Sequence, residues 1–141
     1  MIRFLAILAG APALAIPALA AAAGAADSAA VYSNVCAHPE TGELRGRRIV
    51  ILRFPDANYA LVQFAEGGML PPEAMQVRLD ADELITFAIV DGPMKGTRFR
   101  GMVTDEMLTG AFSTYADPRL APEEVALPRQ RTAPEPMPTC E

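Results

Sequence analysis

The sequence has no tryptophan, one lysine, one histidine and only two cysteines in 141 residues. A single histidine, His38, leaves histidine-based acid–base catalysis one candidate centre. Two cysteines allow one intramolecular disulfide and cannot by themselves complete a closed zinc site. These absences narrow the possible chemistry before any motif is considered.

Positive charge is also scarce. Twelve Lys and Arg residues stand against seventeen Asp and Glu residues, which gives a net charge of -5. A nucleic-acid-binding protein needs a basic stripe that displaces counterions, so we expect no nucleic-acid partner. The hydrophobic share of 51% excludes a disordered chain, and the length predicts a single domain.

The first twenty residues differ from the rest of the chain. Arg3 is followed by an uncharged stretch over 4–23, and small-x-small sites occur at Ala18-Leu19-Ala20 and beyond. This order predicts a signal peptide over residues 1–20, with cleavage as late as residue 26. An uncleaved membrane anchor is the alternative, but Pro12 and Pro17 and the lack of a following basic cluster oppose it. We therefore expect a periplasmic or secreted protein without a stable membrane anchor.

Export would determine the oxidation state of Cys36 and Cys140. An oxidising compartment favours the one disulfide that these two cysteines can form. The bridge would tie the C-terminal end back to the start of the domain. Cys36, His38 and Cys140 could instead be metal ligands, but their spacing is not that of a metal site. The sequence predicts a disulfide and no metal.

After the signal peptide, short apolar runs alternate with turn residues. We expect a flexible lead-in over 21–33, a β domain over 34–128 and a Pro-rich tail over 129–141. Period-2 alternation within the domain predicts strands at 44–54, 59–65, 75–79, 84–90, 97–103, 107–113 and 125–127. About seven strands with short sequential loops are typical of an all-β antiparallel meander, forming a sandwich or a barrel.

One pair of segments is nearly mirror-symmetric about Asp105-Glu106: Phe99-x-Gly101-x-Val103 and Leu108-x-Gly110-x-Phe112. A two-residue loop would pair the two glycines on one face of the sheet. A large side chain, such as Phe87 of the preceding strand, could pack over them. Alternatively, the glycines could leave room for a ligand. Residues that could line such a cavity are Phe87, Phe99, Gly101, Gly110 and Phe112.

Catalytic motifs are missing from the chain. There is no GxGxxG, Walker loop or GxSxG elbow, and His38 stands in a Pro-containing loop. Adjacent carboxylates at Asp82-Glu83, Asp105-Glu106 and Glu123-Glu124 fall in turns, whereas glycosidase chemistry needs carboxyls held apart across a cleft. We expect a protein that is not an enzyme, with no catalytic residues and no cofactor.

Arg98 and Arg100 share one face of a predicted strand, and Arg78 is expected on the same outward face. Guanidinium groups bind carboxylate and phosphate bidentately, so these arginines could hold an anion. They could equally pair with the surplus carboxylates of the chain. Six methionines follow the signal segment without an M-x-x-M cluster, which favours packing over copper binding.

These observations predict an exported, non-catalytic binding module for a small apolar ligand or a protein partner. The alternative is a structural or interaction protein of the cell envelope that acts through a strand edge or the Pro-rich tail. Eleven arginines against one lysine, with abundant Ala and Pro, are typical of a GC-rich bacterial genome.

Overall fold

The computed structural model describes residues 28–114, 119–131 and 136–141. The predicted signal peptide lies outside the described residues. The described part contains β-strands and no helix, so none of its elements could cross a bilayer as a helix. Its strands are β1 (Ser28–Ser33), β2 (Cys36–Ala37), β3 (Leu44–Arg53), β4 (Asn58–Gly67), β5 (Glu73–Leu79), β6 (Leu84–Ala88), β7 (Thr97–Val103), β8 (Met107–Thr114) and β9 (Glu123–Gln130).

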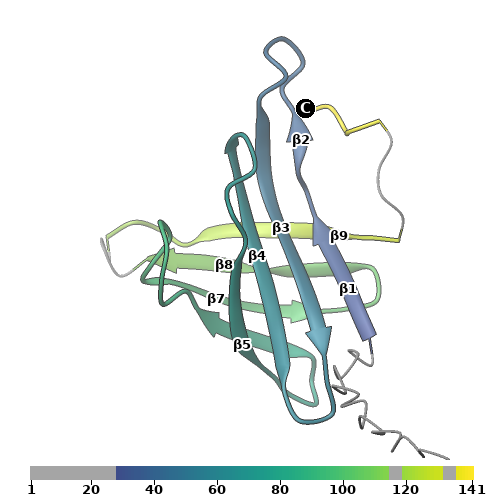
Figure 1. Ribbon diagram of the computed structural model, residues 1–141, viewed down its shortest axis with the longest axis vertical. Helices are drawn as coiled ribbons and strands as arrows, with labels where there is room; N and C mark the ends of the chain where they lie inside the picture. Colours follow the sequence, from purple (N-terminus) through teal and green to yellow (C-terminus); the bar gives the residue numbers. More distant parts are fainter. Residues whose placement is uncertain (1–27, 115–118, 132–135) are drawn as a thin grey trace, which may run out of the picture.

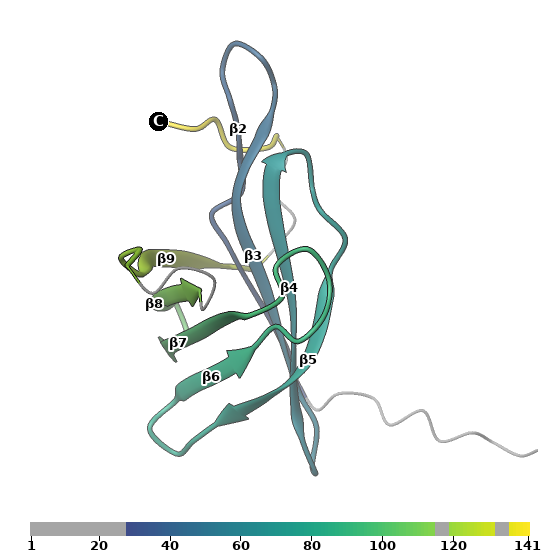
Figure 2. The ribbon, with the colours of Figure 1, turned by 90° about the vertical axis from the view of Figure 1, so that its left-hand side faces the viewer.

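The strands form a closed antiparallel barrel. Strands β3 to β9 follow one another as a meander, and β1 closes the barrel because it pairs with both β3 and β9. Figures 1 and 2 show β3 and β4 nearly upright, with β6 to β9 crossing them. β5 pairs with β4 along its first part and with β6 along its last, so it forms the corner between the two layers. The all-β antiparallel prediction is confirmed, and of sandwich and barrel the fold is a barrel.

Period-2 alternation determines which side chains fill the interior. In β7, Thr97, Phe99, Gly101 and Val103 are buried, while the residues between them are exposed. Successive side chains of a strand point to opposite faces of the sheet. The same alternation buries residues from seven other strands and produces one core at the centre of the barrel.

β1 lies within the range 21–33, which the sequence predicts to be a flexible lead-in. That prediction is wrong for residues 28–33, because β1 pairs with β3 from Ser28↔Arg53 to Ser33↔Arg48. Tyr32 is fully buried. β2 continues β1 in the same register, since Cys36 pairs with Arg45. The remainder of the predicted lead-in, residues 21–27, lies outside the described residues.

The hairpin of β7 and β8 has the predicted register. Gly101 pairs with Gly110, Phe99 with Phe112 and Val103 with Leu108. The turn is the two-residue loop Asp105-Glu106, closed by a hydrogen bond from Thr104 N to Met107 O of 2.8 Å. The Thr104 hydroxyl accepts hydrogen bonds from Glu106 N and Met107 N. Asp-Glu is not a sequence that two-residue hairpin turns prefer, and the hydrogen bonds of the Thr104 side chain stabilise the turn in its place.

Candidate functional site

Four phenylalanine rings fill the centre of the barrel. Phe87 stacks on Phe99 at 5.0 Å between ring centroids, and Phe99 lies 4.7 Å from Phe112. Phe64 reaches Phe112 from the opposite side at 5.5 Å. All four rings are buried. The aromatic positions that the sequence offers as cavity lining are thus in contact with one another.

The glycine pair lies directly under one of these rings. A Cβ atom added to Gly101 would overlap the Phe99 ring and the backbone oxygen of Thr109, and one added to Gly110 would meet the same ring tip. Phe99, rather than Phe87, packs over both glycines. The space beside the glycines on the inner face is occupied by this ring, which is the packing alternative that their sequence pattern leaves open.

Ion pairs lie at both ends of the barrel. At the end where β4–β5 and β8–β9 connect, Arg47 places Nη2 3.2 Å from Glu123 and 3.9 Å from Glu66. Its guanidinium carbon lies 4.8 Å from the centroid of the Phe64 ring. The Arg47 side chain is only 15% exposed. Two ion pairs, a hydrogen bond and the ring contact therefore hold this arginine at this end of the barrel.

The opposite end carries the β3–β4, β5–β6 and β7–β8 turns. There Arg53 Nη2 lies 2.8 Å from Glu83, and Arg129 Nη1 lies 3.3 Å from Asp105. The Tyr32 hydroxyl donates to Thr104 O at 2.9 Å. Burial raises the pKa of Tyr32, and the nearby Arg129 and Arg53 only partly oppose that shift. A recess of about 370 Å³ remains between these groups, with polar and charged walls.

A concavity lies outside the barrel, on the outward face of β5 to β8. Its volume is about 1050 Å³. Strand register places Arg78, Thr86 and Arg100 in one row across β5, β6 and β7, because Arg78 pairs with Thr86 and Thr86 with Arg100. The next row holds Arg98 beside Ala88 and Ser113. All three arginines singled out from the sequence line this concavity, which we call the arginine face.

Arg78 and Arg100 differ from the arginines at the barrel ends in having no carboxylate within 4 Å among the residues that the structure describes. Both are exposed. Arg98 does not belong with these two, because it has an interaction partner. Among the residues that the structure describes, Arg78 and Arg100 are thus the arginines of this face without a carboxylate partner, one on each side of Thr86.

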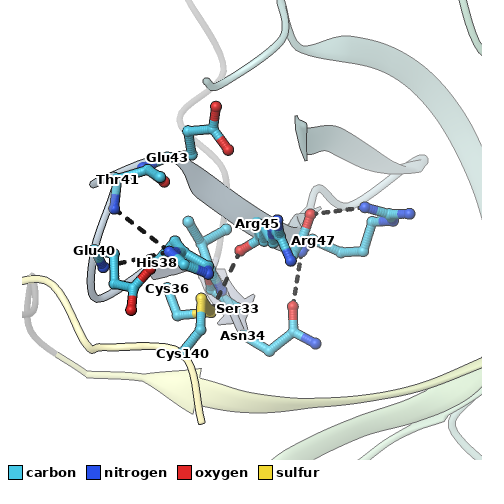
Figure 3. The surroundings of a disulfide bond; sticks show 12 residues. Ser33, Asn34, Cys36, His38, Glu40, Thr41, Glu43, Arg45, Arg47 and Cys140 are labelled. Carbon is cyan, nitrogen blue, oxygen red and sulfur yellow. Dashed lines mark hydrogen bonds between the residues drawn. A yellow bond between two sulfur atoms is a disulfide. The ribbon is translucent and has the colours of Figure 1, made fainter. Parts of the chain in front are cut away.

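The predicted disulfide is present between Cys36 and Cys140, with 104 residues of sequence separation. Figure 3 shows it beside the loop that carries His38. His38 Nδ1 accepts hydrogen bonds from Glu40 N and Thr41 N, so this histidine stabilises its own loop. A bridge over this length contributes about 4 to 5 kcal/mol in the chain-entropy model.

The disulfide also fixes residues 138–140 against β2. Ala37 N donates to Pro138 O at 2.8 Å, and Cys140 N donates to Ala37 O at 2.9 Å. Ala37 and Thr139 form a parallel bridge, so the short edge of β2 is covered by the chain's own end. Figure 1 shows the C-terminus lying beside β2. The predicted tail thus begins later than residue 129, since β9 runs to Gln130.

Within ranges 28–114, 119–131 and 136–141, no group of three or more His, Cys, Asp or Glu side chains could hold a metal ion. His38 faces its own loop, and the three carboxylate pairs lie in turns or at the start of β9. The described residues bring no acid–base pair together in the arginine face. Comparisons with family models, with curated proteins and with solved structures found no match.

Proposed function

We propose that this protein is a non-catalytic binding module that takes a carboxylate-bearing protein partner on its arginine face. The observation that carries the proposal is the Arg78–Thr86–Arg100 row, where two guanidinium groups without carboxylate partners in the described structure flank a hydroxyl in a concavity. Bidentate guanidinium groups suit a planar carboxylate.

The interior gives less support to a small apolar ligand. A binding pocket needs free volume lined by apolar side chains. The phenylalanine cluster occupies the centre of the barrel, and ion pairs lie at both ends. Binding on the outside requires no such opening, so the outer face is the better supported location.

We also propose that the protein works in the periplasm or outside the cell. The disulfide is compatible with an oxidising compartment, and the predicted signal peptide would deliver the chain there. The alternative of an envelope protein acting through a strand edge has less support, because β1 closes the barrel and residues 138–140 cover β2.

A titration with an acidic peptide tests the proposal. The probe is a seven-residue peptide of alternating Ser and Glu, followed by amide chemical shifts of the oxidised protein at low ionic strength. We expect shift changes confined to the outward residues of β5 to β8. The double variant Arg78→Glu/Arg100→Glu should weaken binding at least tenfold, because it replaces attraction by repulsion.

Two further variants make this experiment specific. Arg78→Lys/Arg100→Lys keeps the charge but removes the planar fork, so we expect an intermediate affinity. Arg45→Glu changes an exposed arginine on the β2–β3 hairpin, away from the arginine face, and should leave binding within twofold. Equal weakening by Arg45→Glu, or no loss in the double variant, would contradict the proposed function.

A further inference from the structure

A second, apolar row lies beside the arginines on the same outer face. Leu84 pairs with Met102, Met102 with Thr109, and Thr109 with Ala126. Met102 is 51% exposed, so it presents apolar surface to solvent on the outward side of β7. These residues line a concavity of about 690 Å³ that shares Arg100 and Ala111 with the first one. The two concavities are therefore adjoining parts of one surface.

The spacing of the two rows is that of an extended chain. Arg100 and Met102 are two residues apart on β7, which corresponds to about 6.6 Å along a strand. Alternate side chains of an extended peptide project to one side with the same repeat. A peptide that lies along β7 can thus place one side chain at the arginine row and its neighbour two positions away at the Met102 row.

We propose that the partner segment is extended and carries an acidic residue and an apolar residue two positions apart. This inference rests on the proposed function and names the chemistry of its ligand. The carboxylate accepts from Arg78 and Arg100 above Thr86. The apolar side chain covers Met102 and Leu84 and is removed from water, which stabilises the complex.

A protein segment fits this face better than an anionic membrane. The chain carries a net charge of -5, which opposes approach to an anionic lipid surface. The arginines line a concavity, whereas interfacial membrane binding uses apolar groups that project from the surface. The apolar row also contains Thr109, so it accommodates a single apolar side chain better than a lipid tail.

Four peptides of equal length test the spacing. They carry Glu-Ser-Leu, Glu-Leu-Ser, Glu-Ser-Ser or Gln-Ser-Leu at the centre of a Gly-Ser frame, and chemical-shift titration of the oxidised protein gives each affinity. We expect Glu-Ser-Leu to bind about tenfold more tightly than each of the others. Replacing the carboxylate or the leucine removes the contact that this side chain makes. Moving the leucine by one position turns it away from the Met102 row.

Variants of the protein assign the apolar contact. Met102→Ser should abolish the preference for Glu-Ser-Leu over Glu-Ser-Ser and leave the affinity for Glu-Ser-Ser within twofold. Val90→Ser is the matched control, since Val90 is 65% exposed and lies outside both concavities. It should retain the tenfold preference.

The outcomes separate this inference from the proposed function. If Glu-Ser-Leu and Glu-Ser-Ser bind equally and both depend on Arg78 and Arg100, the spacing inference is overturned and the proposed function stands. If no peptide depends on those arginines, both are overturned. Arginine-dependent binding to vesicles of anionic phospholipid, without any peptide preference, would overturn the choice of a protein segment.

Discussion

The arginines at the barrel ends and those of the arginine face have the same chemistry and opposite surroundings. Arg47, Arg53 and Arg129 point into the openings of the barrel, and each meets a carboxylate within 3.3 Å. Arg78 and Arg100 point outward from the same closed sheet and meet no carboxylate within 4 Å among the described residues. The difference separates arginines that are paired within the fold from arginines without a carboxylate partner among the described residues, and only the latter could serve the partner that we propose.

The contrast follows from the position of each arginine along its strand. An inward-pointing residue at a strand end meets the turns and strand ends of its neighbours, and the carboxylate partners of the three arginines at the barrel ends lie in those places. Glu83 and Asp105 are both turn residues, and each reaches an arginine of another strand. An outward residue in the middle of a sheet meets only its row neighbours, which beside Arg78 and Arg100 are Thr86 and Ala111.

The largest effect is expected where the interior is filled. Phe99→Ala removes the ring that contacts Phe87, Phe112 and both glycines, and should lower the free energy of unfolding by about 3 to 5 kcal/mol. Met102→Ala lies on the outward side of the same strand and should cost less than about 0.5 kcal/mol. Urea unfolding of both variants gives the comparison. Equal losses would contradict the prediction that the inward face of β7 contributes far more to the free energy of unfolding than its outward face.

The sequence predicts this interior well because alternation is a local signal. All seven predicted strands occur, and the Gly101–Gly110 pairing follows from the mirror symmetry about Asp105-Glu106. The disulfide also follows from the sequence, because only two cysteines are available. The sequence does not predict which aromatic ring covers the two glycines. Phe99 covers both glycines from β7, the strand that also carries Gly101. The direction of its ring depends on packing that period-2 alternation does not encode.

β1 was not predicted because its sequence is weak in strand signals. Ser28, Ala29 and Ala30 are small, and only Val31 and Tyr32 have high strand propensity. Pairing with β3 and β9 supplies the missing stability, and burial of Tyr32 fixes the register. The ion pairs at the ends are equally hidden from the sequence, because each joins residues on different strands or turns that lie 19 or more positions apart.

A smaller effect is expected at the barrel end that Arg47 spans. Arg47→Gln removes two ion pairs and the contact with the Phe64 ring, and leaves Glu123 without its partner. We expect a loss of about 1 to 2 kcal/mol, because both carboxylates are more than half exposed and remain solvated. Arg45→Gln, an exposed arginine on the same strand, should change stability by less than about 0.5 kcal/mol. Urea unfolding of the pair decides whether the end arginines are structural.

The smallest effect is expected at Tyr32. This residue should make the stability of its barrel end depend on pH, whereas no tyrosine among the described residues lines the arginine face. Burial raises the pKa of this phenol above its ordinary value of 10.0, while Arg129 and Arg53 lower it and Asp105 and Glu83 raise it. Above pH 10 the unfolded chain therefore releases a proton that the folded chain retains. The contribution of Tyr32 to stability is fully present below pH 10 and is lost as the pH rises through the folded-state pKa.

Tyr32→Phe separates that contribution from the rest of the fold. At neutral pH the variant loses the hydrogen bond to Thr104 O, which should lower the free energy of unfolding by about 1 kcal/mol. Above pH 10 its stability should fall less steeply than that of the parent protein. Tyr59→Phe removes a hydroxyl from an exposed ring on the outer side of the barrel and controls for the neutral-pH loss. Identical alkaline slopes for the parent and Tyr32→Phe would show that burial does not raise the pKa of Tyr32, and hence that water reaches this hydroxyl through the end of the barrel that carries Arg53 and Arg129.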